Sequence, residues 1–382
     1  MKRMIYLLVL PVFCIAGKIN FVYENPFLYE NKADLEDVFL QNLKKLFDFS
    51  KDDGYVLVRQ FHQEMKKGLE LEKSSLLMSR SFLNKISAVS PGVFLALDLG
   101  GTNFRIVAIS IDSSQKITIL NKKSYVLDSK IIKSTGDLFF DDLALKIKQF
   151  LIESHLEDEA IELGFTFSFP IKQENAKSGI LLNWTKEFAI DDVIGKDVVV
   201  CLEQALERQS IDNIQIKALV TDGVATLIAK SFENSLCNIS VIIGTGTDAC
   251  YVEAIENISN VSFSEKSMII DTGWGNFDKL SRNLYDDILD ASSNNPFKQK
   301  VEKLISGKYI GELYRIVLCD LIGKQYLLSP KDLNSFMISH MINAEDLSYI
   351  ENDHSEDLKE IEQFLLKFGI KDSDYASRKK MQ

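Results

Sequence analysis

Residues 94–105 read FLALDLGGTNFR, an apolar run that ends in a glycine pair and short polar residues. The runs Val93 to Leu97 and Arg105 to Ile111 have the apolar pattern of buried strands. Gly100-Gly101 lies between them and predicts a hairpin turn. On the glycine pair alone this would be an ordinary structural turn, so its interpretation depends on the side chains around it.

Those side chains carry phosphate-binding chemistry. Glycines let backbone N–H groups approach a phosphate closely. Thr102 and Asn103 add short donors, Arg105 adds a cation, and Asp98 can hold Mg²⁺ through water. We therefore interpret the turn as a phosphate loop.

The same spacing recurs later in the chain. Gly246-Thr247-Asp248 repeats Gly101-Thr102-Asn103, again between two apolar runs, Ile239 to Ile243 and Ala249 to Ile255. Two such hairpins predict a nucleotide held between two related halves.

Length and charge narrow the class of protein. A chain of 382 residues exceeds the usual size of one core, so we expect two domains. Its 46% hydrophobic and 26% charged residues are typical of a globular protein. The net charge of −11 argues against nucleic acid or an anionic membrane as partner. The four histidines are scattered and no cysteine pair has zinc spacing, so we expect no structural metal site.

The first residues have the pattern of a secretory signal. Lys2-Arg3 precedes an apolar run from Met4 to Ile15, and Cys14 and Ala16 fit the −3 and −1 positions of a cleavage site. The run is short for a membrane span, and we expect none; a buried strand or an N-terminal anchor is the structural alternative. We expect a cleaved signal over residues 1–16 and a secreted protein, with a cytoplasmic location as the alternative.

A carboxylate follows a short apolar strand in the middle of the chain. Ile216 to Val220 predicts the strand, Thr221-Asp222-Gly223 ends it, and the apolar spacing from Val224 predicts a helix. A carboxylate at the carboxyl end of a strand lies where α/β folds place their sites. The structural alternative is that Asp222 is only the N-cap of the helix.

Several motifs together resemble the eukaryotic hexokinase family and occur in the family's order. Besides FLALDLGGTNFR they are LGFTFSFP (163–170), GILLNWTKEF (179–188), the segment 218–229 around Asp222, IGTGTDACY (243–251) and VEKLISGKYIGE (301–312). The resemblance covers roughly residues 40 to 370. It implies an α/β, two-domain, actin-like and ribonuclease-H-like ATPase fold with a cleft between the domains.

The resemblance also implies domain boundaries. After the signal, residues 17–87 are expected to form N-terminal helices that pack on the large domain; helical spacing runs from Ala33 to Phe49 and again to near Gly68. The small domain is expected at 88–219 and the large domain at 220–382. The family's C-terminal segment, which completes the adenosine pocket, would follow Gln382, so we expect a C-terminally incomplete large domain.

Residue roles follow from the same resemblance. Asp222 matches the general base that takes the proton of the 6-hydroxyl of a hexose such as glucose as it attacks the γ-phosphate of ATP. Sugar contacts match Ser168, Thr185, Lys186, Thr221, Asp248 and Glu302. The phosphates of ATP and Mg²⁺ would be met on one side by Asp98 (the magnesium ligand, through water), Gly100, Gly101, Thr102, Asn103 and Arg105, and on the other by Gly244, Thr245, Gly246 and Lys308.

Three sugar positions depart from the family's residues. Thr221 and Asp248 each stand where the family has Asn, and Gly273 stands where it has Glu, because Asp271-Thr-Gly-Trp-Gly275 replaces Asn-x-Glu-Trp-Gly. A hydrogen bond to a charged group contributes about 1.5–3 kcal/mol, so loss of that glutamate would weaken sugar binding about ten- to a hundredfold. Asp248 offers a replacement acceptor, although a carboxylate cannot donate as Asn does, and neighbouring negative groups should raise its pKa.

Two classes of function therefore stay open. The first is an active, secreted hexokinase that catalyses the entry step of glycolysis. It is favoured by the complete first hairpin, by Asp222 and by Thr185-Lys186. Gly273, Asp248 and the early end of the chain favour a catalytically impaired hexokinase-like binding or regulatory protein.

Overall fold

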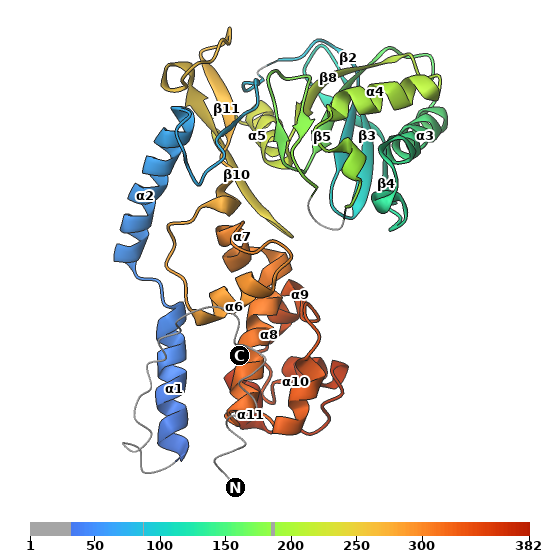
Figure 1. Ribbon diagram of the computed structural model, residues 1–382. Helices are drawn as coiled ribbons and strands as arrows, with labels where there is room; N and C mark the ends of the chain where they lie inside the picture. Colours follow the sequence, from blue (N-terminus) through green and yellow to red (C-terminus); the bar gives the residue numbers. More distant parts are fainter. Residues whose placement is uncertain (1–31, 87, 185–187) are drawn as a thin grey trace. The chain divides into compact units, whose positions relative to one another are not determined.

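The computed structural model describes residues 32–86, 88–184 and 188–382 (Figure 1). The chain divides into two compact units, residues 1–49 and 50–382. The described part of the first unit is helix α1 (Lys32–Phe47), which confirms the helix expected from Ala33 to Phe49. The expected signal peptide lies outside the described residues, and every sheet described below belongs to the second unit.

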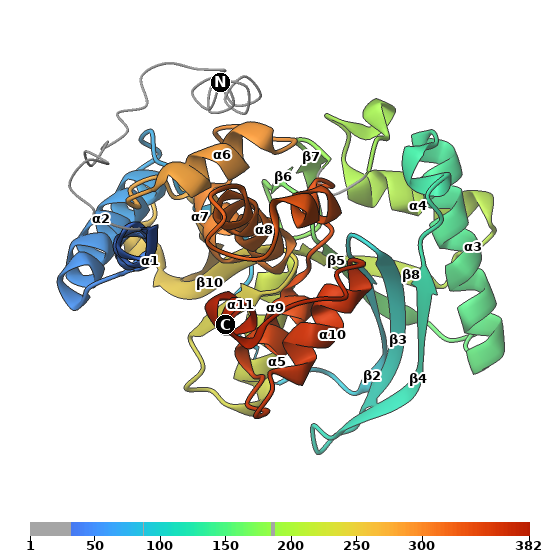
Figure 2. The same ribbon diagram turned by 90° about the horizontal axis from the view of Figure 1, so that it is seen from below.

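The five-stranded sheet contains the FLALDLGGTNFR hairpin. Its strand order is β4-β3-β2-β5-β8, in which β2 pairs antiparallel with β3 and parallel with β5. Helices α3 (Gly136–Ser154) and α4 (Val198–Arg208) pack against each other on one face of this sheet (Figure 2). The strands are β2 (Gly92–Leu99), β3 (Asn103–Ile111), β4 (Ile117–Val126), β5 (Ile161–Phe167) and β8 (Ile214–Val220).

The second sheet contains the Gly246-Thr247-Asp248 hairpin. Its order is β1-β11-β10-β9 and all its pairs are antiparallel. Helix α5 (Asp222–Glu233) packs against β9, β10 and β11. The strands are β1 (Ser79–Arg80), β9 (Ile239–Ile243), β10 (Thr247–Ala254) and β11 (Ser267–Asp271). The two predicted hairpins are thus confirmed, and each joins the first two strands of an antiparallel three-stranded segment, β2-β3-β4 or β9-β10-β11.

Two large apolar clusters hold these elements. Alternate residues of β2, β3 and β5 are buried against α3 and α4. On the other sheet, Leu69 at the end of α2 (Lys51–Leu69) joins Met78, Met268, Ile270 and Phe277. Ser50 begins α2 with a reciprocal capping box to Asp53, which satisfies two backbone donors of the first turn.

The remaining elements are short. Strands β6 (Ile171–Lys172) and β7 (Ile180–Leu181) form a two-stranded sheet. Helices follow at α6 (Leu284–Ser292), α7 (Lys300–Ile305), α8 (Gly307–Gly323), α9 (Ala344–Glu351), α10 (Lys359–Lys367) and α11 (Tyr375–Met381). Within the described ranges, none of the helices has the length and apolar content that crossing a bilayer requires.

Candidate functional site

The first phosphate hairpin places a carboxylate beside a cation. Asp98 on β2 is the register partner of Arg105 on β3, and Arg105 Nη1 lies 2.7 Å from Asp98 Oδ2. The turn is closed by the Gly100 N–H, which donates to the Asn103 carbonyl at 3.0 Å. The side chains of Asp98 and Arg105 are both partly exposed. A hard carboxylate oxygen open to water fits Mg²⁺, which keeps most of its waters and takes few protein ligands.

Ser168 lies next to this hairpin. It follows the last residue of β5, and its N–H donates to the carbonyl of Leu99, the last residue of β2, at 3.2 Å. Because β2 and β5 are parallel neighbours, their carboxyl ends meet at one edge of the sheet. Two further predicted sugar residues, Thr185 and Lys186, lie outside the described residues.

Asp222 is the first residue of α5 and is not its N-cap. The N-cap is Thr221, which makes no side-chain capping bond, so the structural alternative for Asp222 was wrong. Asp222 Oδ1 accepts the N–H of Gly223 at 3.0 Å. The positive end of the helix dipole favours a carboxylate here. Gly223 allows close packing, because a Cβ there would lie 2.6 Å from Cys250 Sγ.

Asp248 lies close to two other carboxyl groups. Burial, followed by the charge of Asp271, the hydrogen bond to Asp271 and the charge of Asp222, raises the pKa of the Asp248 carboxyl well above its usual range. The sequence predicted this direction. The expectation that Asp248 cannot donate is corrected, however, because a carboxyl group that keeps its proton has an O–H to give.

The second phosphate hairpin is tied to helices α7 and α8. The N–H of Gly307 donates to the Gly244 carbonyl at 2.7 Å, and that of Lys308 to the Thr245 carbonyl at 3.2 Å. Glu302 Oε2 accepts the N–H of Thr247 at 3.2 Å, next to Gly246. The structure therefore brings together the predicted phosphate residues Gly244, Thr245, Gly246 and Lys308 and the predicted sugar residue Glu302.

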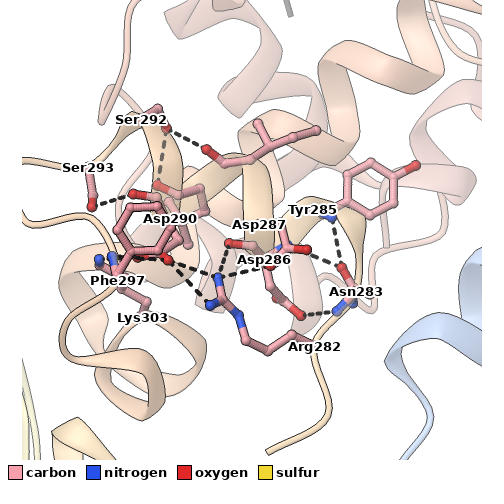
Figure 3. Close-up of polar contacts among 12 residues, drawn as sticks. Arg282, Asn283, Tyr285, Asp286, Asp287, Asp290, Ser292, Ser293, Phe297 and Lys303 are labelled. Atoms are coloured by element: carbon pink, nitrogen blue, oxygen red, sulfur yellow. Dashed lines mark hydrogen bonds and ion pairs between the residues drawn. The ribbon is translucent and has the colours of Figure 1, made fainter. Parts of the chain in front are cut away.

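A buried ion pair anchors the helix that carries Glu302 (Figure 3). Lys303 on α7 and Asp290 on α6 form a salt bridge, and each side chain is 3% exposed. Arg282 also contacts Asp290, at 3.2 Å. Burial opposes ionisation of Asp290, but the hydrogen bond and charge of Lys303, the Phe297 N–H and Arg282 outweigh it and lower its pKa. The ion pair therefore holds α7, the helix that carries Glu302, against α6.

Gly273 has a backbone that suits glycine. It lies in the left-handed region, with φ +56° and ψ +39°. A Cβ there would lie 2.8 Å from Cβ, Cγ and Cδ1 of Leu77. The N–H groups of Leu77 and Met78 donate to the Thr272 carbonyl at 3.0 and 3.3 Å, which fixes Leu77 against this turn. Leu77 therefore lies against the position where a side chain at 273 would begin.

The structure adds residues that the sequence did not single out. Asp271 accepts the Thr221 hydroxyl at 2.6 Å, and Cys250 is its register partner on β10. One ligating atom each of Asp248, Cys250 and Asp271 lies within 4.8 Å of the others. The spacing of cysteine pairs does not reveal this group, because it contains a single cysteine. The alternation Asp-x-Cys on a predicted strand was the available signal, since it puts both side chains on one face.

The sequence of this chain is similar to that of known proteins. One family model described as hexokinase matches residues 39–232, and a second matches residues 238–382. The chain belongs to the hexokinase family. It is 36% identical over 317 residues to Hexokinase-1 of Rattus norvegicus, covering 80% of this chain and 34% of that protein. It is 34% identical over 330 residues to human Hexokinase-3, covering 85% and 35%. The chain thus spans about a third of the length of the curated relatives it matches.

Solved hexokinase structures share the fold. The hexokinase of Schistosoma mansoni complexed with glucose superposes with a TM-score of 0.83 at 27% identity, over 92% of this chain and 81% of that one. A second hexokinase crystal structure superposes with a TM-score of 0.75 at 24% identity, over 91% and 81%. The predicted two-domain α/β fold of the actin-like ATPases is confirmed.

Proposed function

We propose that this chain transfers the γ-phosphate of ATP to the 6-hydroxyl of a hexose such as glucose. Its support is membership of the hexokinase family and likeness to a hexokinase whose structure contains glucose. The observation that carries the proposal is the position of Asp222 at the first turn of α5, where β8 ends and where the carboxyl groups of Asp248 and Asp271 also lie.

In this proposal Asp222 is the general base. Its carboxylate takes the proton of the 6-hydroxyl, the hydroxyl oxygen forms a bond to the γ-phosphorus, and the bond to the β-phosphate oxygen breaks to release ADP. Arg105 and Lys308 supply positive charge near the two hairpins, whose glycines admit the phosphates. Mg²⁺, held through water by Asp98, would neutralise phosphate charge when bound.

Sugar binding is assigned to residues on several elements. Ser168, Thr221, Asp248 and Glu302 are the candidates that the structure describes, and the Thr221 hydroxyl donates to Asp271. Thr185 and Lys186 complete the set by family resemblance. Hydrogen bonds from several directions would fix the 6-hydroxyl toward Asp222, and such positioning provides most of the rate enhancement in phosphoryl transfer.

A catalytically impaired, hexose-binding or regulatory protein is the second candidate. The observation that favours it is Gly273, which lacks the family's carboxylate and faces Leu77. In this case the protein would bind a hexose, but addition of the hexose would not increase the rate at which ATP is converted to ADP.

The experiment is ADP release with and without a panel of hexoses. We expect hexose-dependent ADP release that falls about 10²–10⁴-fold in Asp222→Ala, while exposed Asp212→Asn, a charge-removing control on a loop, keeps the wild-type rate. Hexose binding by calorimetry without any hexose-dependent ADP release would instead support the impaired protein. Binding of neither hexose nor ATP would refute both.

We also propose that the protein is exported, on the pattern of residues 1–16 alone. Mass spectrometry of the native N-terminus should then find a chain that begins near Gly17. A native protein that retains Met1 and stays in the producing cell would contradict this proposal.

A further inference from the structure

Three ionisable side chains form a compact group beside Asp222. Asp248 and Cys250 lie two residues apart on β10 and share one face of the strand. Cys250 is the register partner of Asp271, the last residue of β11. One ligating atom from each of the three lies within 4.8 Å of the others. Asp248 is half-buried, whereas Cys250 and Asp271 are buried.

The hydrogen bonds around the two carboxyl groups decide which one holds a proton. Asp271 accepts on both oxygens, from the Thr221 hydroxyl at 2.6 Å on Oδ2 and from the Gly273 N–H at 3.0 Å on Oδ1. Asp248 accepts the Ala249 N–H on Oδ1 at 2.8 Å. A carboxyl oxygen of Asp248 and one of Asp271 lie within 4.8 Å of each other, and two carboxylates this close in a buried site repel unless one of them keeps a proton. Asp271 already accepts from two donors, so Asp248 is the group that keeps the proton.

We propose that Asp248 and Asp271 share one proton, so that Asp248 acts as a neutral acid beside Asp222, and that Asp271 is the positioning residue that keeps it neutral. This inference rests on the proposed hexose phosphotransferase function. A neutral carboxyl group donates through its O–H and accepts through its carbonyl oxygen, as an amide does. Asp248 can therefore serve a hexose in the manner of the Asn that the family has at this position.

The groups that face Asp248 make this form the stable one. They are Asp222 from α5, Cys250 from β10 and Asp271 from the end of β11. Burial, followed by the charge of Asp271, raises the pKa of the Cys250 thiol, so the thiol stays neutral. An ionised Asp248 would repel both neighbouring carboxylates.

This arrangement sets an alkaline limit on hexose binding. Below the raised pKa Asp248 is neutral and the site is intact, and above it a further negative charge lies beside Asp222. Loss of one proton from the binding-competent form should raise the Kd for glucose about tenfold per pH unit on the alkaline side.

The test is calorimetric titration of glucose into the full chain as a function of pH. Wild type should show the alkaline limb, and Asp248→Asn, which is neutral at every pH, should lack it. Asp271→Asn should move the limb to lower pH, since Asp248 then loses the neighbour that holds its proton. A limb that is unchanged in Asp248→Asn, or unmoved in Asp271→Asn, would overturn the proposal. Circular dichroism of each variant excludes misfolding as the cause.

A second readout does not depend on sugar. The infrared spectrum at neutral pH should contain a carboxylic-acid carbonyl band that Asp248→Asn removes and that Asp212→Asn, at an exposed acid, leaves in place. The band should be present before and after dialysis against a chelator. Absence of the band, or its appearance only after chelation, would overturn the proposal, the latter because a metal ion on these three side chains displaces the proton. If wild type binds no glucose at any pH but the band behaves as described, the proposed function fails and the shared proton stands.

Discussion

A side chain at position 273 should cost stability for two separable reasons. The first is the left-handed backbone at Gly273, which costs a residue with a Cβ about 1–2 kcal/mol. The second is contact with Leu77, since the new Cβ would lie 2.8 Å from three of its carbon atoms. Leu77 is 52% exposed, so its Cγ and Cδ1 can turn away, but its Cβ is fixed by the backbone and stays in the path of the new side chain. We therefore apply the cost of overpacking, about 1–3 kcal/mol. We therefore expect Gly273→Ala to lower the free energy of unfolding by about 2–5 kcal/mol.

The chain offers a matched control for the first of these effects. Gly195 also has a positive φ, of +82°, but a Cβ there would meet nothing within 4 Å. Gly195→Ala should thus show only the backbone cost, about 1–2 kcal/mol. The difference between the two substitutions measures the contact with Leu77.

Urea unfolding followed by circular dichroism gives these free energies, and a double-mutant cycle isolates the contact. Leu77→Gly removes all three opposing carbon atoms, so Gly273→Ala combined with Leu77→Gly should be more stable than the sum of the single changes by about 1–3 kcal/mol. If Gly273→Ala costs no more than Gly195→Ala, or if the cycle shows no coupling, the account of Leu77 as the steric obstacle is refuted.

Three further predictions concern buried polar groups. Burial opposes ionisation of Glu64, but hydrogen bonds from Lys67 and nearby serines outweigh it and lower the pKa of Glu64 to about 2. The ionised Glu64 therefore stabilises the fold fully above pH of about 4.5, and this stabilisation is lost as the pH falls toward about 2. The free energy of unfolding should thus fall by about 3 kcal/mol less over this pH range in Glu64→Gln than in wild type. Lys303→Met leaves the buried Asp290 with Arg282 as its remaining cation and should cost up to about 3–5 kcal/mol in urea unfolding, whereas a cost below about 1 kcal/mol would contradict a buried pair. Thr221→Val removes the donor to Asp271 Oδ2 and should lower stability by about 1–3 kcal/mol, with Thr221→Ser as the variant expected to retain it.

The hairpins and their neighbours could be predicted because their signals are local. Apolar runs on either side of Gly100-Gly101 and Gly246-Thr247-Asp248 define both strands and the turn between them, and each strand pairs with its neighbour in the chain. The start of α5 was predicted for the same reason. The roles of individual residues came from the family resemblance, because the spacing of apolar residues indicates strands and helices but not chemical roles.

The contacts that decide how the sugar site works are not local. Thr221 and Asp271 are 50 residues apart, yet their side chains meet. Leu77 lies in a segment before the first sheet and packs against the turn at Gly273. Neither pairing leaves a pattern in the sequence, because each depends on how strands from different parts of the chain assemble. The sequence therefore showed that Gly273 and Asp248 differ from the family, but not what surrounds them.

Thr221, Asp248 and Gly273, the three positions that differ from the family, are all linked through Asp271. Asp271 accepts the Thr221 hydroxyl and the Gly273 N–H, and it shares a proton with Asp248 in the arrangement proposed above. A glutamate at 273 would place another negative charge two residues from Asp271, on a backbone that Leu77 already obstructs. Reversal of that single departure should therefore weaken the site, because the new carboxylate would meet the negative charge of Asp271 and the side chain of Leu77.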